Sequence, residues 1–131
     1  MKKKILVVVA NYYKDISADL NIQAKTILLK NKLKNDCITV PGVFEIPVII
    51  SKNINKYDGF IALGCVIKGK TPHFDFISKA VTEAIMKLSI DSKKPIGNGI
   101  ITCLNRDQAV VRSKSKGQEA ANAVLSVLKS F

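Results

Sequence analysis

The chain has 131 residues, of which 47% are hydrophobic and 24% are charged, so we expect a single domain spanning 1–131 with a sizeable core. No apolar run approaches the ~20 residues that a membrane helix needs. The formal net charge is +11, which suits a nucleic-acid binder or an enzyme with an anionic substrate. The lysines are spread along the whole chain without an RNA-binding aromatic motif, which favours no nucleic-acid partner.

The first half of the chain alternates short apolar runs with helical patterns. Residues 5–9 predict a buried strand, although the lysines before them also resemble the start of a secretory signal. Residues 17–34 predict a helix with Ser17 as its N-cap, and residues 37–40 predict a short strand that ends at Pro41-Gly42. The helical face expected to be buried carries Leu20, Ala24, Ile27 and Leu28. Residues 44–54 predict a helix, with Pro47 tolerated in its first turn.

The second half repeats this alternation. Residues 59–67 and 96–103 predict two further strands, and residues 72–90 predict a long helix between them. The side chains of that helix expected to face inward are Phe76, Ile77, Ala80, Val81, Ala84, Ile85 and Leu88. Asn105 is expected to cap the last helix, with Gln108 placed for a capping box. Gly117 is expected to kink or interrupt this helix before an amphipathic segment at 120–128.

Strands that alternate with helices predict right-handed βαβ units and a parallel sheet. Because the strands are apolar throughout, helices should cover both faces of the sheet. Ligands of such sheets bind beyond the carboxyl ends of the strands. The loops expected to carry function are therefore residues 10–16, 41–44, 67–71 and 104–105.

The segment Ile67-Lys-Gly-Lys-Thr-Pro-His73 follows a strand and opens a helix. Thr71 and Pro72 suit the N-cap and first helical positions, where free backbone N–H groups can bind an anion. Lys68 and Lys70 add donors. From the residues alone, a phosphate site and a simple helix start both remain open.

His73 is the only histidine, and a neutral imidazole beside a helix N-terminus can accept a proton. An ordinary surface histidine is the alternative. Glu45 can accept hydrogen bonds from polyol hydroxyls, although a carboxylate in a first helical turn also simply supports the helix dipole. Tyr12 and Tyr13 follow the first strand, where an aromatic ring can stack on a planar ligand or pack on the next helix.

Cys37, Cys65 and Cys103 are far apart in the sequence, so a zinc site of the usual spacing is absent. Each lies in or beside an apolar run, and each is expected to be a small buried side chain. Nothing in this pattern requires an oxidising compartment, so the cytoplasm is the expected location.

Together these segments resemble the lumazine synthase family. The likeness is carried by Pro41-Gly-Val-Phe-Glu-Ile-Pro47, by the run from Gly64 to Asp75, and by Asp107-Gln-Ala109 with Arg112. It covers nearly the whole chain. It implies a flavodoxin-like three-layer α/β/α sandwich around a four-stranded parallel sheet, and a homopentamer with active sites between subunits. The implied enzyme condenses 5-amino-6-ribitylaminouracil with 3,4-dihydroxy-2-butanone 4-phosphate in riboflavin biosynthesis, without metal or organic cofactor.

The resemblance also implies roles for individual residues. The ribitylaminouracil would be bound by Tyr12, Val43, Phe44, Glu45, Val66, Ile67 and Asn98. The butanone phosphate would be bound by Lys68, Gly69, Lys70, Thr71, Arg112 and Lys116. His73 would transfer protons, and the neighbouring subunit would supply Asn98 and Arg112. A riboflavin synthase is an implied partner.

The chain departs from the family pattern in ways that bear on the pocket and on assembly. Tyr12 stands for a common phenylalanine, and Asn98 stands where many members have phenylalanine. The strand that usually precedes Ile5 is missing, and the segment 113–117 is shorter than in capsid-forming members. The rival interpretations are a riboflavin synthase of the same fold, which would consume lumazine, and a non-catalytic flavin- or nucleic-acid-binding protein.

Overall fold

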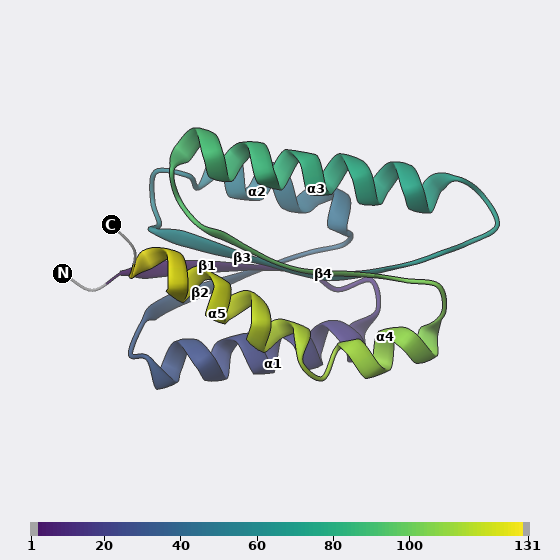
Figure 1. Cartoon of the computed structure of the whole chain (residues 1–131), viewed down its shortest axis with the longest axis horizontal. Coiled ribbons are helices and arrows are strands. Elements are labelled where there is room, and N and C mark those ends of the chain that lie inside the picture. Colours follow the sequence, from purple (N-terminus) through teal and green to yellow (C-terminus); the bar gives the residue numbers. More distant parts are fainter. Residues whose placement is uncertain (1–2, 130–131) are drawn as a thin grey trace.

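The computed structural model describes residues 3–129, which form a three-layer α/β/α sandwich (Figure 1). Its sheet holds four parallel strands in the order β2-β1-β3-β4. The strands are β1 (Lys4–Ala10), β2 (Lys34–Val40), β3 (Gly59–Ile67) and β4 (Ile96–Cys103). The flavodoxin-like fold class expected from the sequence is confirmed.

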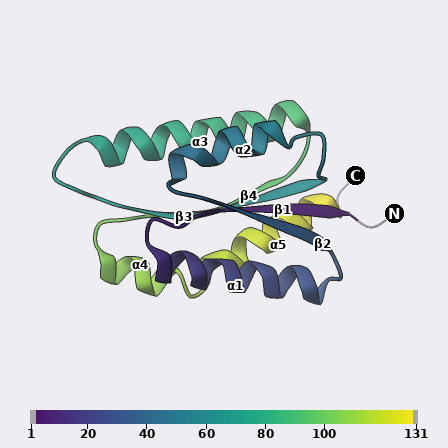
Figure 2. The same cartoon turned by 180° about the vertical axis from the view of Figure 1, so that it is seen from behind.

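Helices cover both faces of this sheet, as Figures 1 and 2 show from opposite sides. One face carries the 3₁₀ turn η1 (Val43–Glu45), α2 (Ile46–Lys52) and α3 (His73–Ser92). The other face carries α1 (Lys14–Lys30), α4 (Arg106–Arg112) and α5 (Lys116–Leu128). Alternate residues of β1 feed two cores, since Ile5, Val7 and Val9 pack towards α1 and α5 whereas Leu6 and Val8 pack towards α2 and α3.

The first helix begins three residues earlier than expected and ends four residues earlier. Ser17 is not its N-cap. It lies inside α1, is 3% exposed, and donates its hydroxyl to the Lys14 carbonyl at 3.1 Å. The helix stops at Lys30 because the chain turns through Lys32, whose φ is 57°, and Lys34 already pairs with Lys4 in the sheet. The buried face was expected correctly: Leu20, Ala24 and Leu28 are fully buried, and Ile27 packs against the same core.

The next elements keep their predicted places with shifted bounds. The second strand starts at Lys34 rather than at residue 37, because backbone pairing with β1 extends beyond its apolar part. The predicted helix at 44–54 divides into η1 and α2, with Pro47 in the first turn of α2 as expected.

Helix α3 buries a narrower stripe than the sequence indicates. Val81 and Ile85 are buried, and Ile77 and Leu88 pack partly against the same core. Phe76 is 68% exposed, and Ala80 is also exposed, so their predicted inward positions are wrong. The inward stripe repeats every three or four residues from Ile77 to Leu88, and Phe76 lies about 100° round the helix from Ile77.

The carboxyl-terminal helices are joined by a break at 113–115. The predicted cap is confirmed: the Asn105 side-chain oxygen accepts the Gln108 N–H at 2.9 Å, while the Gln108 side chain accepts the Leu104 N–H at 2.8 Å. Gly117 is not the interruption. It lies in the first turn of α5, where an added Cβ would collide with the backbone of Leu20, so it permits close packing of α5 on α1.

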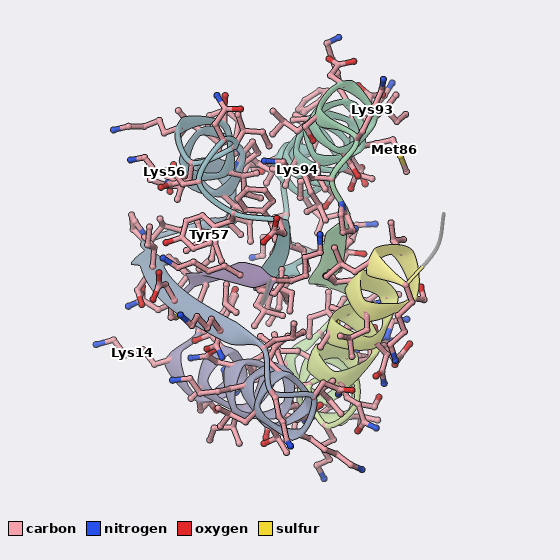
Figure 3. The ribbon with its side chains drawn as sticks, turned by 90° about the vertical axis from the view of Figure 1, so that its left-hand side faces the viewer. Lys14, Lys56, Tyr57, Met86, Lys93 and Lys94 are labelled. Carbon is pink, nitrogen blue, oxygen red and sulfur yellow. The ribbon has the colours of Figure 1, made fainter. Side chains whose placement is uncertain are left out.

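The amino ends of the strands are tied together by polar contacts, and Figure 3 views this end of the molecule. The Tyr57 hydroxyl donates to Asp36 at 2.7 Å, and the Lys4 ammonium lies 3.3 Å from the same carboxylate. The tyrosine hydrogen bond, followed by Lys4, lowers the pKa of Asp36. Lys94 lies between α2 and α3 and donates to the Ile54 carbonyl at 2.5 Å (Figure 3).

We expect Gly97→Ala to destabilise the fold. A Cβ on Gly97 would press into the Ala120 carbonyl of α5 and lie 2.9 Å from Val124 Cγ2. Overpacking of this kind costs ~1–3 kcal/mol. Denaturant unfolding at a fixed protein concentration measures the loss. Gly69→Ala is the control, since an added Cβ there meets no atom within 4 Å. Equal midpoints for Gly97→Ala and the unmodified protein would show that α5 shifts freely.

Candidate active site

The first hollow lies beyond the carboxyl ends of β1 and β3, and we call it the tyrosine hollow. Its volume is about 350 Å³, near the lower end of ligand pockets. It is lined by Tyr12, Tyr13, Gly42, Val43, Phe44, Cys65, Val66, Ile67, His73 and Ile77. Parallel strands of similar register bring these loops to one edge, where the sequence predicted the site.

Two tyrosines form one wall of the tyrosine hollow. Tyr12 is 75% exposed, and its ring meets Tyr13 edge-on, with centroids 5.0 Å apart and planes at 80°. Burial, together with Cys65 and Tyr12, raises the pKa of Tyr13, so its phenol is neutral near pH 7. The wall therefore offers an exposed aromatic ring beside a neutral hydroxyl, which suits a planar ligand.

The segment after β2 forms a second wall. Val43 is buried against Gly64, where an added Cβ would lie 2.6 Å from Val43 Cγ1. Phe44 is 60% exposed and lines the hollow. Glu45 is half-buried at the end of η1 but does not line the hollow. Its carboxylate instead lies close to Gly42, since a Cβ there would be 3.1 Å from Glu45 Oε1.

The segment between β3 and α3 extends beyond the sheet (Figure 1). Lys68 N–H donates to the Cys103 carbonyl at 2.9 Å, and the following residues through Thr71 are exposed. The helix starts one residue later than expected: Pro72 is the N-cap and His73 the first helical residue. The Thr71 hydroxyl accepts the His73 N–H at 3.4 Å, so it still contributes to the start of α3. Lys68, Gly69, Lys70 and Thr71 lie outside the tyrosine hollow, whereas His73 lines it.

A second hollow of about 380 Å³ lies against the edge strand β4, and we call it the arginine hollow. It is lined by Ile100, Ile101, Thr102, Arg112, Ser115, Lys116 and Glu119. Arg112 donates through Nη1 to the Thr102 carbonyl at 2.8 Å, which holds its guanidinium at the strand edge. Two cationic side chains and one carboxylate make this surface suited to an anion that carries hydroxyl groups.

The two hollows share no residue, so one chain separates the predicted site into two parts. Tyr12, Val43, Phe44, Val66, Ile67 and His73 gather in the tyrosine hollow, while Arg112 and Lys116 line the arginine hollow. Asn98 lines neither. It is exposed on β4, and its side-chain oxygen accepts the Ile100 N–H at 3.0 Å.

Several residues near the two hollows were not predicted from the sequence, and only some of them line a hollow. Thr102 could have been found, because it stands near the carboxyl end of a predicted strand. Ser115 and Glu119 carry no such signal.

Asp15 and Arg106 form an ion pair between the first turns of α1 and α4, and their separation of 91 residues offers no sequence pattern. That hydrogen bond is the main cause of the lowered pKa of Asp15.

Within residues 3–129, no group of three or more histidine, cysteine or acidic side chains is placed to hold a metal ion. The same range contains no helix that is long and apolar enough to cross a membrane.

The fold and the two hollows define the class of protein: a flavodoxin-like α/β protein with an aromatic-lined hollow beyond the carboxyl ends of its parallel strands. The sequence profile described as 6,7-dimethyl-8-ribityllumazine synthase matches residues 2–131. The chain therefore belongs to the 6,7-dimethyl-8-ribityllumazine synthase family, transferases of riboflavin biosynthesis.

Individual relatives agree along nearly the whole chain. The 6,7-dimethyl-8-ribityllumazine synthase of Bartonella tribocorum is 42% identical, covering 98% of this chain and 91% of the relative. That of Agrobacterium fabrum is 40% identical, covering 98% and 94%. That of Corynebacterium kroppenstedtii is 38% identical, covering 98% and 84%.

The three thiols differ in environment. Cys65 and Cys103 are buried as expected, but Cys37 is exposed, because β2 is an edge strand with one open face. Burial raises the pKa of Cys65 to about 12, with Cys103 adding to the effect. Although Cys37 is exposed, partial desolvation of its thiol raises its pKa. Although Cys65 lines the tyrosine hollow, it is a protonated thiol near neutral pH and does not serve as a nucleophile.

We expect iodoacetamide at pH 8 to alkylate Cys37 in the folded protein and to spare Cys65 and Cys103. The thiolate is the reactive form, and a pKa of about 12 leaves roughly one part in 10⁴ of Cys65 ionised. Labelling of Cys37 should accelerate as the pH rises towards its raised pKa. Peptide mass spectrometry quantifies each site, with Cys37→Ser and the unfolded chain as controls. Equal labelling of Cys65 and Cys37 would contradict this assignment.

Proposed function

We propose that this protein joins 5-amino-6-ribitylaminouracil to 3,4-dihydroxy-2-butanone 4-phosphate, releasing phosphate and water and using no metal or organic cofactor. The observation that carries the proposal is the tyrosine hollow, where Tyr12, Phe44 and His73 meet beyond the strand ends in a chain of this family. The exposed ring of Tyr12 stacks on the pyrimidine. Val43, Phe44 and Glu45 hold the ribityl chain, and the backbone at Val66 and Ile67 binds the ring.

The phosphate is held at the start of α3. Gly69, Lys70 and Thr71 cradle it with the free N–H groups of the helix start, and Lys68 adds positive charge. His73 stands two residues after Thr71 and lines the tyrosine hollow, which supports a place between the two substrates. It transfers protons during imine formation and phosphate elimination, in the role of a general acid–base.

The site is completed by a neighbouring subunit. Arg112 and Lys116 bind the phosphate from the neighbour's arginine hollow, and the neighbour's Asn98 approaches the pyrimidine. The separation of the two hollows on one chain supports this arrangement. If the tyrosine hollow of each subunit meets the arginine hollow of the next, the contacts run head to tail and can close into a ring.

We propose that the ring is a pentamer that does not close into a larger shell. The apolar side chains Phe76, Met86 and Ile90 are 60–68% exposed along α3 and provide surface for subunit contacts. Met86 points away from α2 (Figure 3). The short segment at 113–117 supports the absence of a shell.

The three free thiols suit the cytoplasm, and a riboflavin synthase is the partner that would use the product.

Lumazine fluorescence after incubation with both substrates tests the reaction. We expect His73→Ala to lower kcat by ~10²–10⁴-fold without abolishing turnover, because positioning of the two substrates survives. Lys79→Ala is the control, since Lys79 is exposed on the same helix. Full activity of His73→Ala would remove His73 from the mechanism. Consumption of lumazine instead of its formation would favour a riboflavin synthase.

Mixed rings test the inter-subunit site. His73→Ala and Arg112→Ala chains each carry one damaged half-site. Random co-assembly of equal amounts leaves about a quarter of the pockets with both halves intact. We therefore expect activity above the average of the two separate variants. Verified mixed rings without any gain would place His73 and Arg112 of one chain in the same pocket. Mixing each variant with itself by the same procedure controls for refolding losses.

A further inference from the structure

The break between α4 and α5 is held by helix α1. Ser113 is 3% exposed, and its hydroxyl lies 3.0 Å from the Asp19 carboxylate and 2.9 Å from the Val110 carbonyl, so it donates to one or both. Its own carbonyl accepts the Gln23 side-chain N–H at 2.6 Å. Asp19 and Gln23 are four residues apart and therefore lie on one face of α1. One buried serine thus lies within hydrogen-bond distance of α1 through its hydroxyl and is bonded to α1 through its backbone carbonyl.

The packing beside Ser113 leaves little freedom. Gly117 rests on the backbone of Leu20, which lies between Asp19 and Gln23 in the sequence, and a side chain at position 117 would collide with it. Ser113 N–H also donates to the Ala109 carbonyl at 2.9 Å. The junction of α4 with α5 is therefore fixed against α1 at two points, by Ser113 and by Gly117.

Each of the two fixed points directly follows one of the cations of the arginine hollow. Arg112 directly precedes Ser113, and Lys116 directly precedes Gly117. The Arg112 guanidinium reaches the Thr102 carbonyl, so its position depends on how the end of α4 is placed over β4. Neither Asp19 nor Gln23 lines the hollow.

We propose that Ser113, together with Asp19 and Gln23, is a positioning set that aligns Arg112 and Lys116 for the anionic substrate. The proposal rests on the function proposed above and deepens it. The three residues do not touch the substrate. They act by fixing where α4 ends and α5 begins, so that both cations present their charge at the same hollow.

The test measures the KM of each substrate and the affinity for inorganic phosphate by titration calorimetry. We expect Ser113→Ala and Asp19→Ala to weaken phosphate binding and to raise the KM of the butanone phosphate by about three- to tenfold, the effect of one net hydrogen bond. The KM of the ribitylaminouracil should stay unchanged. Asp19→Asn retains an acceptor oxygen and should restore most of the affinity.

A double-mutant cycle separates positioning from general damage. If Ser113 acts through Arg112 and Lys116, Ser113→Ala should cause a smaller loss in an Arg112→Ala protein than in the unmodified protein, because only Lys116 is left to be displaced. Ser17→Ala is the matched control, because Ser17 is also 3% exposed, but its hydroxyl donates to the Lys14 carbonyl within its own turn of α1. It should leave the affinity for phosphate unchanged. If Ser113→Ala does not fold, Asp19→Ala and Gln23→Met carry the same test from half-buried positions.

The outcomes are distinct. The proposal would be overturned if Ser113→Ala, Asp19→Ala and Gln23→Met all left the phosphate affinity unchanged. It would also be overturned if the KM values of both substrates rose equally, or if the losses from Ser113→Ala and Arg112→Ala were fully additive. Phosphate binding needs no turnover. If the protein binds phosphate in a manner that depends on Ser113 but forms no lumazine, the proposed reaction fails while the positioning role stands.

Discussion

The structure depends on the pairing of β1 with a parallel strand on each side. Backbone N–H and C=O groups in a dry core need partners, and β1 obtains them from β2 and β3 along nearly its whole length. Its side chains from Ile5 to Ala10 are at most 4% exposed, so both helical layers are built on this strand. The same register ends β1 and β2 side by side at Ala10 and Val40, while β3 continues beyond them to Ile67. That alignment brings Tyr12, Val43 and Val66 to one hollow although they are far apart in the sequence.

The sequence predicted the elements whose signals are local. Strand β3 has the predicted bounds, because a continuous apolar run between Asp58 and Lys68 leaves few alternatives, and β4 also has its predicted bounds. The Asn105 cap was also predicted, since its partner Gln108 is three residues away. Ser17 and Gly117 were misassigned because tertiary packing, not local preference, decides their places: Ser17 is buried within α1, and Gly117 meets Leu20 across a helix contact. Cys37 and Phe76 were expected inside because sequence periodicity does not indicate which strand lies at an edge or how wide a stripe a helix buries.

The candidate site was predictable in the same partial way. Placing ligands at strand ends led to Tyr12, Phe44 and His73, which meet in one hollow. The sequence contains no distance between Arg112 and those residues, and only the structure shows that the basic pair faces a different hollow. The chemistry of the site also depends on burial. A thiol and a phenol in the tyrosine hollow keep their protons, because burial raises the pKa of Cys65 and of Tyr13. His73 lies exposed at the start of α3 and lines the same hollow.

Helix α1 has a consequence for how sequences of this kind can change in length. Its first residues follow the two tyrosines, and its second and third turns carry Asp19 and Gln23 to the junction of α4 and α5. The number of helical turns from Tyr13 to Gln23 therefore sets the distance between the tyrosine hollow and the junction of α4 and α5. Inserting one residue between Tyr13 and Asp19 would rotate the contact face by about 100° and carry both side chains away from Ser113. Length variation among related chains should therefore avoid this stretch, and the count of residues from Tyr13 to Gln23 should stay constant.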